Sequence, residues 1–113
     1  MVNQSLKDKK IIISAGASGI GLATAKVCLL RGATVYLCDI DSKSINKLNK
    51  HPLKNKRLFA YLCDASNEYH VSDFFKEIIK KTKKSLYLQE HLELVWRLQK
   101  YAFQEEQPFI FVI

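Results

Sequence analysis

A run of small residues between two apolar segments constrains the fold of this chain most. Residues 14–21 are Ser-Ala-Gly-Ala-Ser-Gly-Ile-Gly, and seven of these eight are small. Three consecutive isoleucines precede the run, which predicts a buried strand over residues 10–14. The residues from Gly19 to about Arg31 favour a helix that Ser18 is placed to cap and that Gly32 ends. A strand, a tight turn and a helix are therefore expected to follow one another directly.

The same alternation continues further along the chain. We expect strands over residues 34–38 and 58–63, each ending at an aspartate, with a short helix over residues 42–50 between them. A longer helix is predicted from its cap at Ser66 to Lys84, with lysines in the last turns, where the helix dipole favours cations. Because parallel strands need crossover helices, this β-α-β-α-β-α order predicts an α/β fold with a parallel sheet.

The composition is that of an ordinary globular protein, with 48% hydrophobic and 26% charged residues. No stretch approaches the roughly 18 apolar residues of a membrane span, so we expect no membrane partner. Cys28, Cys38 and Cys63 lie in apolar runs without a Cys-x-x-Cys spacing, which favours buried free thiols and a cytoplasmic location. The histidines lie far apart in the sequence, so we expect no metal site.

The net charge of +7 is unevenly distributed. Residues 1–85 carry 16 basic and 7 acidic side chains, whereas residues 86–113 carry 2 basic and 4 acidic ones. The lysines are scattered over helix ends and loops and have no interleaved aromatic residues, so they favour a solvated surface over a nucleic-acid site.

Apolar residues recur at helical spacing in the first helix, at Ile20, Ala23, Val27 and Leu30.

The glycine turn is suited to a phosphate group. Small residues let a pyrophosphate approach the backbone closely, and the N-terminus of the following helix presents N–H groups and partial positive charge. A tight turn without a ligand is the alternative for the turn alone. Asp39 lies 18 residues after Gly21, close to the roughly 20 expected for a carboxylate that binds ribose hydroxyls. Asp64 ends the third strand at the same edge of the sheet, which favours a dinucleotide as ligand.

The glycine spacing also excludes two other loops. The pattern G-x-x-G-x-G differs from the G-x-G-x-x-G of many other dinucleotide-binding folds. The chain has Leu22-Ala23 where a Walker loop would have Lys-Ser/Thr after its last glycine, so a P-loop is excluded.

Residues 10–84 resemble the N-terminal part of the short-chain dehydrogenase/reductase family, in its classical type. Residues 14–21 match the family loop T-G-x-x-x-G-x-G, with Ala15 in place of the first glycine and Gly16 displaced by one. "GASGIGLATA" followed by "RGATVYLCDID" is characteristic of such members. The resemblance implies a Rossmann-type doubly wound parallel sheet, truncated here after the third β-α unit and followed by a helical tail.

The resemblance also implies the residues of a cofactor site. Asp39 would bind the adenine-ribose hydroxyls, Ile20 would line the site, and Asp64 with Ala65 would contact the adenine. The full predicted set is Ser14, Gly16, Ser18, Gly19, Ile20, Gly21, Asp39, Asp64 and Ala65. A carboxylate at Asp39 would repel the additional phosphate of NADP, and Ile40 beside it is uncharged, so NAD is favoured as the cofactor.

The catalytic residues of the family have no counterpart in this sequence. The family uses a tyrosine as acid and base, with a lysine four residues later that lowers the tyrosine pKa. The residues four positions after the five tyrosines are Ile40, Ala65, Asp73, His91 and Glu105. The Asn-Asn-Ala-Gly segment of the family is also missing. We therefore expect no catalytic residue here and an inactive chain.

Two regions are expected: a dinucleotide-binding half over residues 1–84 and a divergent amphipathic tail over residues 85–113. Helical spacing of apolar residues from Leu88 to Ala102 predicts a fourth helix, followed by an apolar stub at residues 109–113. A reading-frame or splicing change could explain the tail, since one codon choice for residues 89–91 gives Ala-Gly-Ala in another frame.

A non-catalytic module that binds NAD or another subunit is the alternative function, and the resemblance leaves open a homo-oligomer in a full-length relative.

Overall fold

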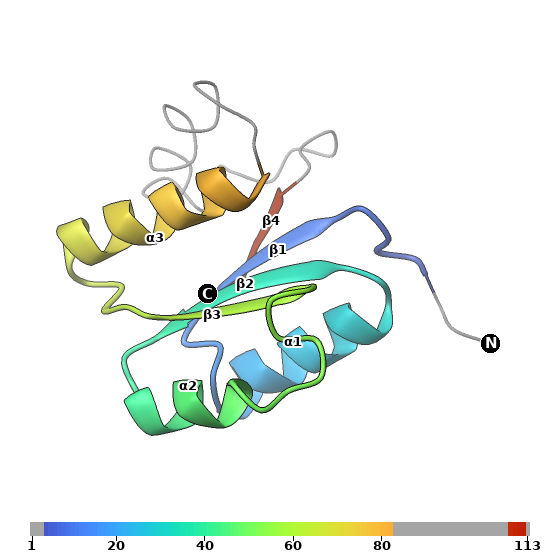
Figure 1. The fold of residues 1–113 in the computed structure, drawn as a ribbon, viewed down its shortest axis with the longest axis horizontal. Coiled ribbons are helices and arrows are strands. Elements are labelled where there is room, and N and C mark those ends of the chain that lie inside the picture. Colours follow the sequence, from blue (N-terminus) through green and yellow to red (C-terminus); the bar gives the residue numbers. More distant parts are fainter. Residues whose placement is uncertain (1–3, 83–108, 113) are drawn as a thin grey trace.

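The computed structural model describes residues 4–82 and 109–112. Four strands and three helices occur in this part of the chain (Figure 1). In chain order they are β1 (Lys10–Ser14), α1 (Gly19–Leu30), β2 (Thr34–Asp39), α2 (Ser42–Leu48), β3 (Leu58–Leu62), α3 (Glu68–Thr82) and β4 (Phe109–Val112).

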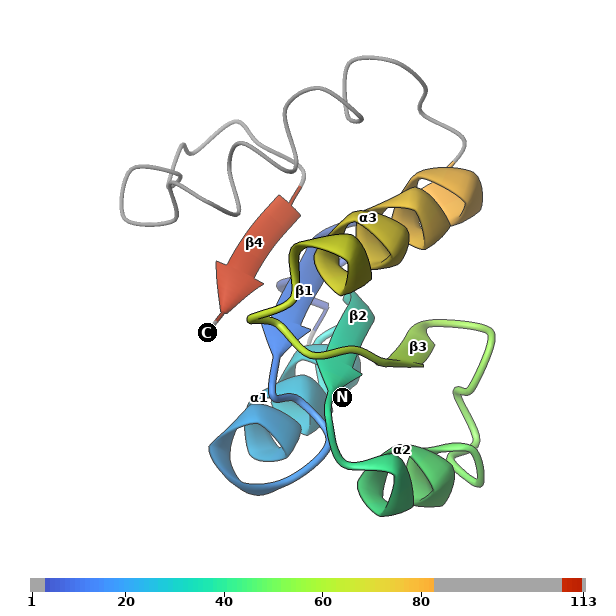
Figure 2. The ribbon, with the colours of Figure 1, turned by 90° about the vertical axis from the view of Figure 1, so that its left-hand side faces the viewer.

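All pairings in the sheet are parallel, and the strand order is β3-β2-β1-β4 (Figure 2). In the centre of the sheet, Ile11 of β1 lies opposite Val35 of β2 on one side and Ile110 of β4 on the other. The first three strands, and the helices between them, fall where the hydrophobic pattern predicts them. The predicted parallel α/β fold is confirmed.

The fourth strand was not expected from the sequence, which indicated only an apolar stub at residues 109–113. In the structure β3 is at one end of the sheet, and residues 109–112 pair with β1, the first strand in the chain. A pairing between segments about 100 residues apart leaves no local signal in the sequence. The predicted fourth helix lies outside the described residues.

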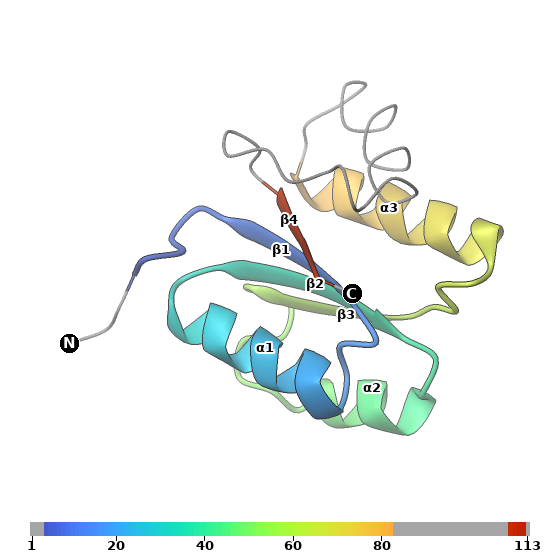
Figure 3. The same cartoon turned by 180° about the vertical axis from the view of Figure 1, so that it is seen from behind.

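Helices cover both faces of the sheet. Figures 1 and 3 show α1 and α2 on one face and α3 on the other. Side chains alternate between the faces along each strand. Ile11 and Ile13 therefore pack with the α1 and α2 side, whereas Ile12 packs with Phe75 and Ile78 of α3. This division explains why the isoleucine run is apolar throughout: both of its faces are buried.

Helix α1 is apolar around most of its circumference. Ala25, Cys28 and Leu29 face the sheet and are buried. The residues that recur at helical spacing in the sequence lie on the exposed side of the helix instead, and they are Ile20, Ala23, Val27 and Leu30. Spacing alone could not identify the buried face, because both faces carry apolar residues.

The helix termini agree with the sequence in part. Gly32 follows α1 with a φ of +92°, a left-handed conformation that suits glycine as a stop. The predicted cap at Ser66 is wrong, because Asn67 holds the first turn of α3. The Asn67 Oδ1 accepts the backbone N–H groups of Tyr69 and His70, at 2.9 and 3.2 Å.

The three cysteines are buried and free, as predicted. Burial raises the pKa of the Cys28, Cys38 and Cys63 thiols above the ordinary value, which keeps them protonated and poorly nucleophilic. Among the described helices, none has the length and apolarity that crossing a membrane requires.

Candidate functional site

The carboxyl ends of β1, β2 and β3 lie at one edge of the sheet, and the predicted site residues follow them (Figure 1). The glycine turn over residues 15–18 follows β1, Asp39 is the last residue of β2, and Asp64 lies two residues after β3. Ligands of open α/β sheets bind at this edge. The topology therefore brings together three segments that are separate in the sequence.

The carboxylate of Asp39 lies directly against the glycine turn. The Ala17 N–H donates a hydrogen bond of 3.1 Å to Asp39 Oδ2, and the Asp41 N–H donates one of 3.0 Å to Oδ1. A further bond of 3.1 Å joins the Gly16 N–H to the Cys38 carbonyl. Asp39 is 7% exposed, and each oxygen keeps an additional lone pair for a ligand hydroxyl. The predicted approach of this carboxylate to the turn is present.

The three glycines of the turn have different surroundings. A Cβ on Gly16 would lie 2.7 Å from the Leu37 Cβ, and a Cβ on Gly21 would lie 2.3 Å from the Ala15 carbonyl oxygen. Both positions therefore require glycine so that strand and helix can pack closely. Gly19 has a φ of +57°, and a Cβ there would meet nothing within 4 Å. At Gly19 the backbone faces open space, which is the surface that a phosphate group needs.

Ala15 has a φ of +52°, in the left-handed region that side chains other than glycine rarely adopt. This is the position at which the matching loop pattern has its first glycine. The alanine therefore keeps the conformation of the turn at a cost in backbone strain, which the sequence indicated only as a departure from the pattern.

The N-terminus of α1 is open toward the same edge of the sheet. Ser18 is the N-cap residue with extended backbone, but its hydroxyl makes no capping hydrogen bond, and the first turn of the helix contains no acidic residue. Ile20, in that turn, is 87% exposed. The positive end of the α1 dipole therefore faces the glycine turn, and no acidic side chain in the first turn of the helix offsets it.

Asp64 forms the third part of the edge. Its Oδ1 accepts hydrogen bonds from the Ser66 N–H and hydroxyl, at 2.9 and 2.6 Å. These bonds from Ser66 hold the pKa of the Asp64 carboxyl below its ordinary value. Ala65 beside it is exposed.

One residue at this edge was not found from the sequence. His70, in the first turn of α3, accepts a 3.1 Å hydrogen bond from the Asp64 N–H at its Nδ1 atom. This bond fixes the loop after β3 to the start of α3. A histidine six residues after an aspartate is no known motif, so no signal in the sequence could have indicated it.

These residues fit a dinucleotide better than a metal ion. The open backbone at Gly19 and the uncapped N-terminus of α1 suit a pyrophosphate, and the Asp39 carboxylate suits the hydroxyls of an adjacent sugar. In the described part of the chain, no three His, Cys, Asp or Glu side chains are grouped so that they could bind a metal ion.

The family model described as short chain dehydrogenase matches residues 9–88. The chain belongs to the short-chain dehydrogenase family. Short-chain dehydrogenase reductase 3c of Arabidopsis thaliana is 36% identical over 76 residues, which are 67% of this chain and 29% of the relative. The chain thus spans less than a third of the length of this relative.

Solved structures of the family have the same architecture. A hydroxysteroid dehydrogenase from Escherichia coli superimposes with a TM-score of 0.62 at 28% identity, over 74% of this chain and 35% of that protein. A short chain oxidoreductase with an atypical catalytic center, from Pseudomonas aeruginosa PAO1, gives 0.60 at 29% identity, over 66% of this chain and 30% of that protein. The family resemblance and the Rossmann-type fold predicted from the sequence are confirmed.

Proposed function

We propose that this chain is the cofactor-binding part of an NAD-dependent short-chain oxidoreductase, and that these 113 residues bind NAD without transferring hydride. The observation that carries the proposal is the hydrogen bond from the Ala17 N–H to Asp39 Oδ2, at 3.1 Å. It joins the turn suited to a pyrophosphate to the carboxylate suited to a ribose, at the edge of the sheet where dinucleotides bind.

Each part of the site has a role in this proposal. The open backbone at Gly19 and the Ser18 hydroxyl contact the pyrophosphate, whereas Gly16 and Gly21 let the turn pack closely beneath it and the buried Ser14 leads into the turn. Asp39 accepts hydrogen bonds from the ribose hydroxyls. The exposed Ile20 side chain lines the cofactor, and the loop at Asp64 and Ala65 contacts the adenine.

The local charge supports NAD over NADP. Asp39 would face the 2′-phosphate of NADP at short range, and the exposed neighbour Ile40 offers no positive charge. Asp41 adds a second carboxylate, whose pKa is held below its ordinary value by hydrogen bonds, chiefly from the Ser44 hydroxyl. Two carboxylates beside the sugar make an additional phosphate unfavourable.

The sequence supports binding without turnover. Complete members of the family transfer hydride between the nicotinamide and an alcohol or a carbonyl, with a tyrosine and a lysine four residues apart. None of the five tyrosines of this chain has a lysine at that spacing. We therefore propose that hydride transfer belongs to a longer relative, and that its substrate is bound by segments that have no counterpart in these residues.

Calorimetric titration of the chain with NAD and with NADP tests the proposal. We expect NAD to bind more tightly than NADP. Asp39→Asn keeps the shape of the side chain and removes its charge, so NAD affinity should fall about tenfold, the equivalent of one charge-assisted hydrogen bond. The preference for NAD should also shrink. Asp73→Asn, an exposed carboxylate on α3, is the matched control and should leave both affinities unchanged.

The results that contradict the proposal are equally clear. If neither nucleotide binds the folded chain, or if Asp39→Asn and Asp73→Asn behave alike, the site is not where we place it. Hydride transfer measured with NAD and a series of alcohols should be absent, and activity would refute the non-catalytic part of the proposal.

A subunit-interaction module is the second candidate. It is supported by the apolar side chains on the outer side of α1, where Leu30 is 72% and Val27 47% exposed. Exposed apolar groups of this size favour contact with another polypeptide. Concentration-dependent association in sedimentation experiments, without NAD binding, would favour this candidate over the first.

A further inference from the structure

A recess lies near the end of α1 that is opposite to the glycine turn. Its volume is about 350 Å³, in the lower part of the range of roughly 300–1,000 Å³ that small ligands occupy. Three leucines and three basic side chains line most of it, namely Leu29, Leu30, Leu53, Lys26, His51 and Arg57. The recess therefore combines an apolar surface with positive charge.

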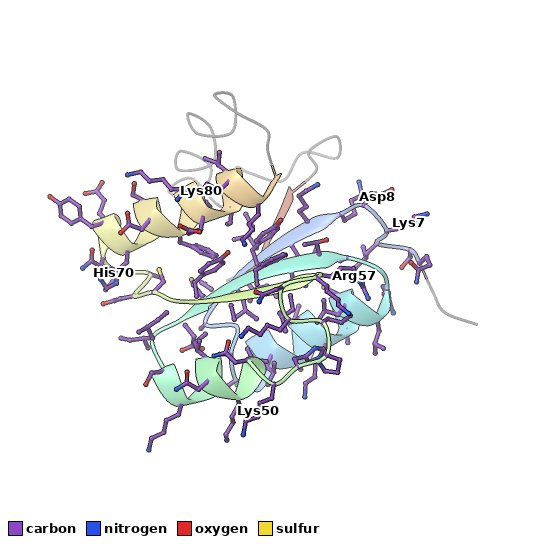
Figure 4. The ribbon with its side chains drawn as sticks, viewed as in Figure 1. Lys7, Asp8, Lys50, Arg57, His70 and Lys80 are labelled. Atoms are coloured by element: carbon purple, nitrogen blue, oxygen red, sulfur yellow. The ribbon has the colours of Figure 1, made fainter. Side chains whose placement is uncertain are left out.

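This basic recess is separate from the proposed cofactor site. Leu29 and Leu30 are the last residues of α1, roughly 16 Å along the helix axis from Gly19 at its start. Figure 4 shows Arg57 and His70 at opposite ends of the molecule, and His70 belongs to the edge where the cofactor is proposed to bind. The two sites share no residue, so an inference about one does not depend on the other.

The guanidinium of Arg57 is held in place by the end of α1. Its Nη1 atom donates hydrogen bonds of 2.9 Å to the Leu29 carbonyl and 3.1 Å to the Ala33 carbonyl. Both bonds are donated by Nη1. The N–H groups on Nε and Nη2 are further donors of the same guanidinium. The cation is thus oriented before any ligand arrives, which reduces the entropy that binding would cost.

His51 is oriented in a similar way. Its Nδ1 atom accepts a 3.0 Å hydrogen bond from the Leu53 N–H. The neutral imidazole therefore carries its proton on Nε2, and the ring offers a donor to the recess. Lys26, on the exposed side of α1, adds a flexible cation at the rim.

The positive charge around the recess is not neutralised locally. Residues 42–58 contain six basic side chains and no acidic one. Within the described ranges, the one ion pair is Lys80–Glu77 on α3, so neither Lys26 nor Arg57 has a carboxylate at ion-pairing distance there. Lys50, two residues after α2, adds a further cation on the α2 side of the sheet (Figure 4).

We propose that this basic recess binds a small anionic amphiphile, a carboxylate attached to a short apolar chain. The oriented guanidinium and the His51 donor would hold the carboxylate, and the leucines would cover the chain. An inorganic anion would leave the leucines uncovered, and an uncharged apolar molecule would leave the cations without a partner. Only an amphiphile would contact both the leucines and the basic side chains of the recess.

Isothermal titration of the 113-residue chain with octanoate tests this proposal, with 1-octanol and acetate as the two partial ligands. Octanoate should bind more tightly than either. Saturating NAD should leave the octanoate affinity unchanged, so that failure at one site can be distinguished from failure at the other. Addition of octanoate to the unsubstituted chain should also shift the NMR signals of the Leu30 and Leu53 methyl groups.

Lys26→Glu is the informative variant, because Lys26 is exposed and its replacement should not affect folding. Reversing a charge at the rim should weaken octanoate binding about fivefold or more. Lys76→Glu makes the same change on α3, on the other face of the sheet, and should change the affinity less than about twofold. No binding of octanoate, equal binding of octanol, or equal effects of the two variants would each overturn the proposal.

Discussion

Ala15 holds the glycine turn in a conformation that costs an alanine more than a glycine. Its φ is +52°. Its carbonyl oxygen packs so closely on Gly21 that a Cβ on Gly21 would lie only 2.3 Å from it. The turn therefore depends on the backbone of Ala15 staying in the left-handed region. At this position a conformation that serves the site opposes the intrinsic preference of the residue.

Replacing this alanine by glycine should stabilise the fold. Left-handed backbone costs a residue with a Cβ about 1–2 kcal/mol, of which the greater flexibility of unfolded glycine offsets roughly 0.5–1 kcal/mol. We expect Ala15→Gly to raise the free energy of unfolding by up to about 1 kcal/mol, measured by urea denaturation.

Ala17→Gly in the same turn is the control for Ala15→Gly. Ala17 is buried and is not among the described residues with a positive φ. This substitution should lower the free energy of unfolding, because glycine gains entropy in the unfolded chain without relieving strain. Equal shifts in the two variants would contradict the strain assigned to Ala15.

Two aspartates fix the loops that lead into α2 and α3. Asp41 accepts the Ser44 hydroxyl at 2.7 Å and the Lys43 N–H at 3.1 Å. Asp64 accepts the Ser66 hydroxyl at 2.6 Å. Each serine donates to a charged carboxylate, and both carboxyl groups have a pKa below the ordinary 3.8.

The lowered pKa values of Asp41 and Asp64 predict a pH dependence with a definite sign. Because the folded-state pKa is depressed, the stabilisation is fully present above the ordinary value and is lost as the pH falls through the lowered one. NMR titration of the carboxyl carbons should therefore give midpoints below 3.8 for both groups.

Serine substitutions separate the two aspartates. Ser66→Ala should raise the Asp64 midpoint and leave that of Asp41 unchanged, whereas Ser44→Ala should do the reverse. Each variant is the control for the other. A midpoint that does not respond to loss of its own serine would show that the hydroxyl is not the cause of the shift.

Elements with a strong local signal could be predicted from the sequence. The isoleucine run predicts β1 because both of its faces are buried, and the spacing from Gly21 to Asp39 predicts the approach of the carboxylate to the turn. The exposed face of α1 could not be predicted, because apolar residues occupy both sides of that helix. Asn67 replaces Ser66 as the cap of α3 because Ser66 donates to Asp64 instead.

At the scale of the whole molecule, β1 is one of the two inner strands of the sheet. It lies between β2 and β4, and its carboxyl end leads into the glycine turn. Pairing of β4 with β1 was not predictable, because the two segments are distant in the sequence and the pairing depends on the complete sheet. Because β4 pairs along β1, we expect residues 109–112 to stabilise the first strand and the turn that follows it.

Proline substitutions in β4 test this dependence. Successive residues of a strand direct their N–H groups to opposite sides, so only one of Ile110→Pro and Phe111→Pro removes an N–H that faces β1. In that variant the amide hydrogens of β1 should exchange about tenfold faster, since lost pairing costs roughly 1 kcal/mol or more. The other variant should have a much smaller effect on β1. The bond from the Val35 N–H of β2 to the carbonyl of Arg57, the residue before β3, should stay protected in both variants. Unchanged exchange in β1 for both variants would show that β4 does not stabilise the centre of the sheet, and the glycine turn would then be held by β2 and α1 alone.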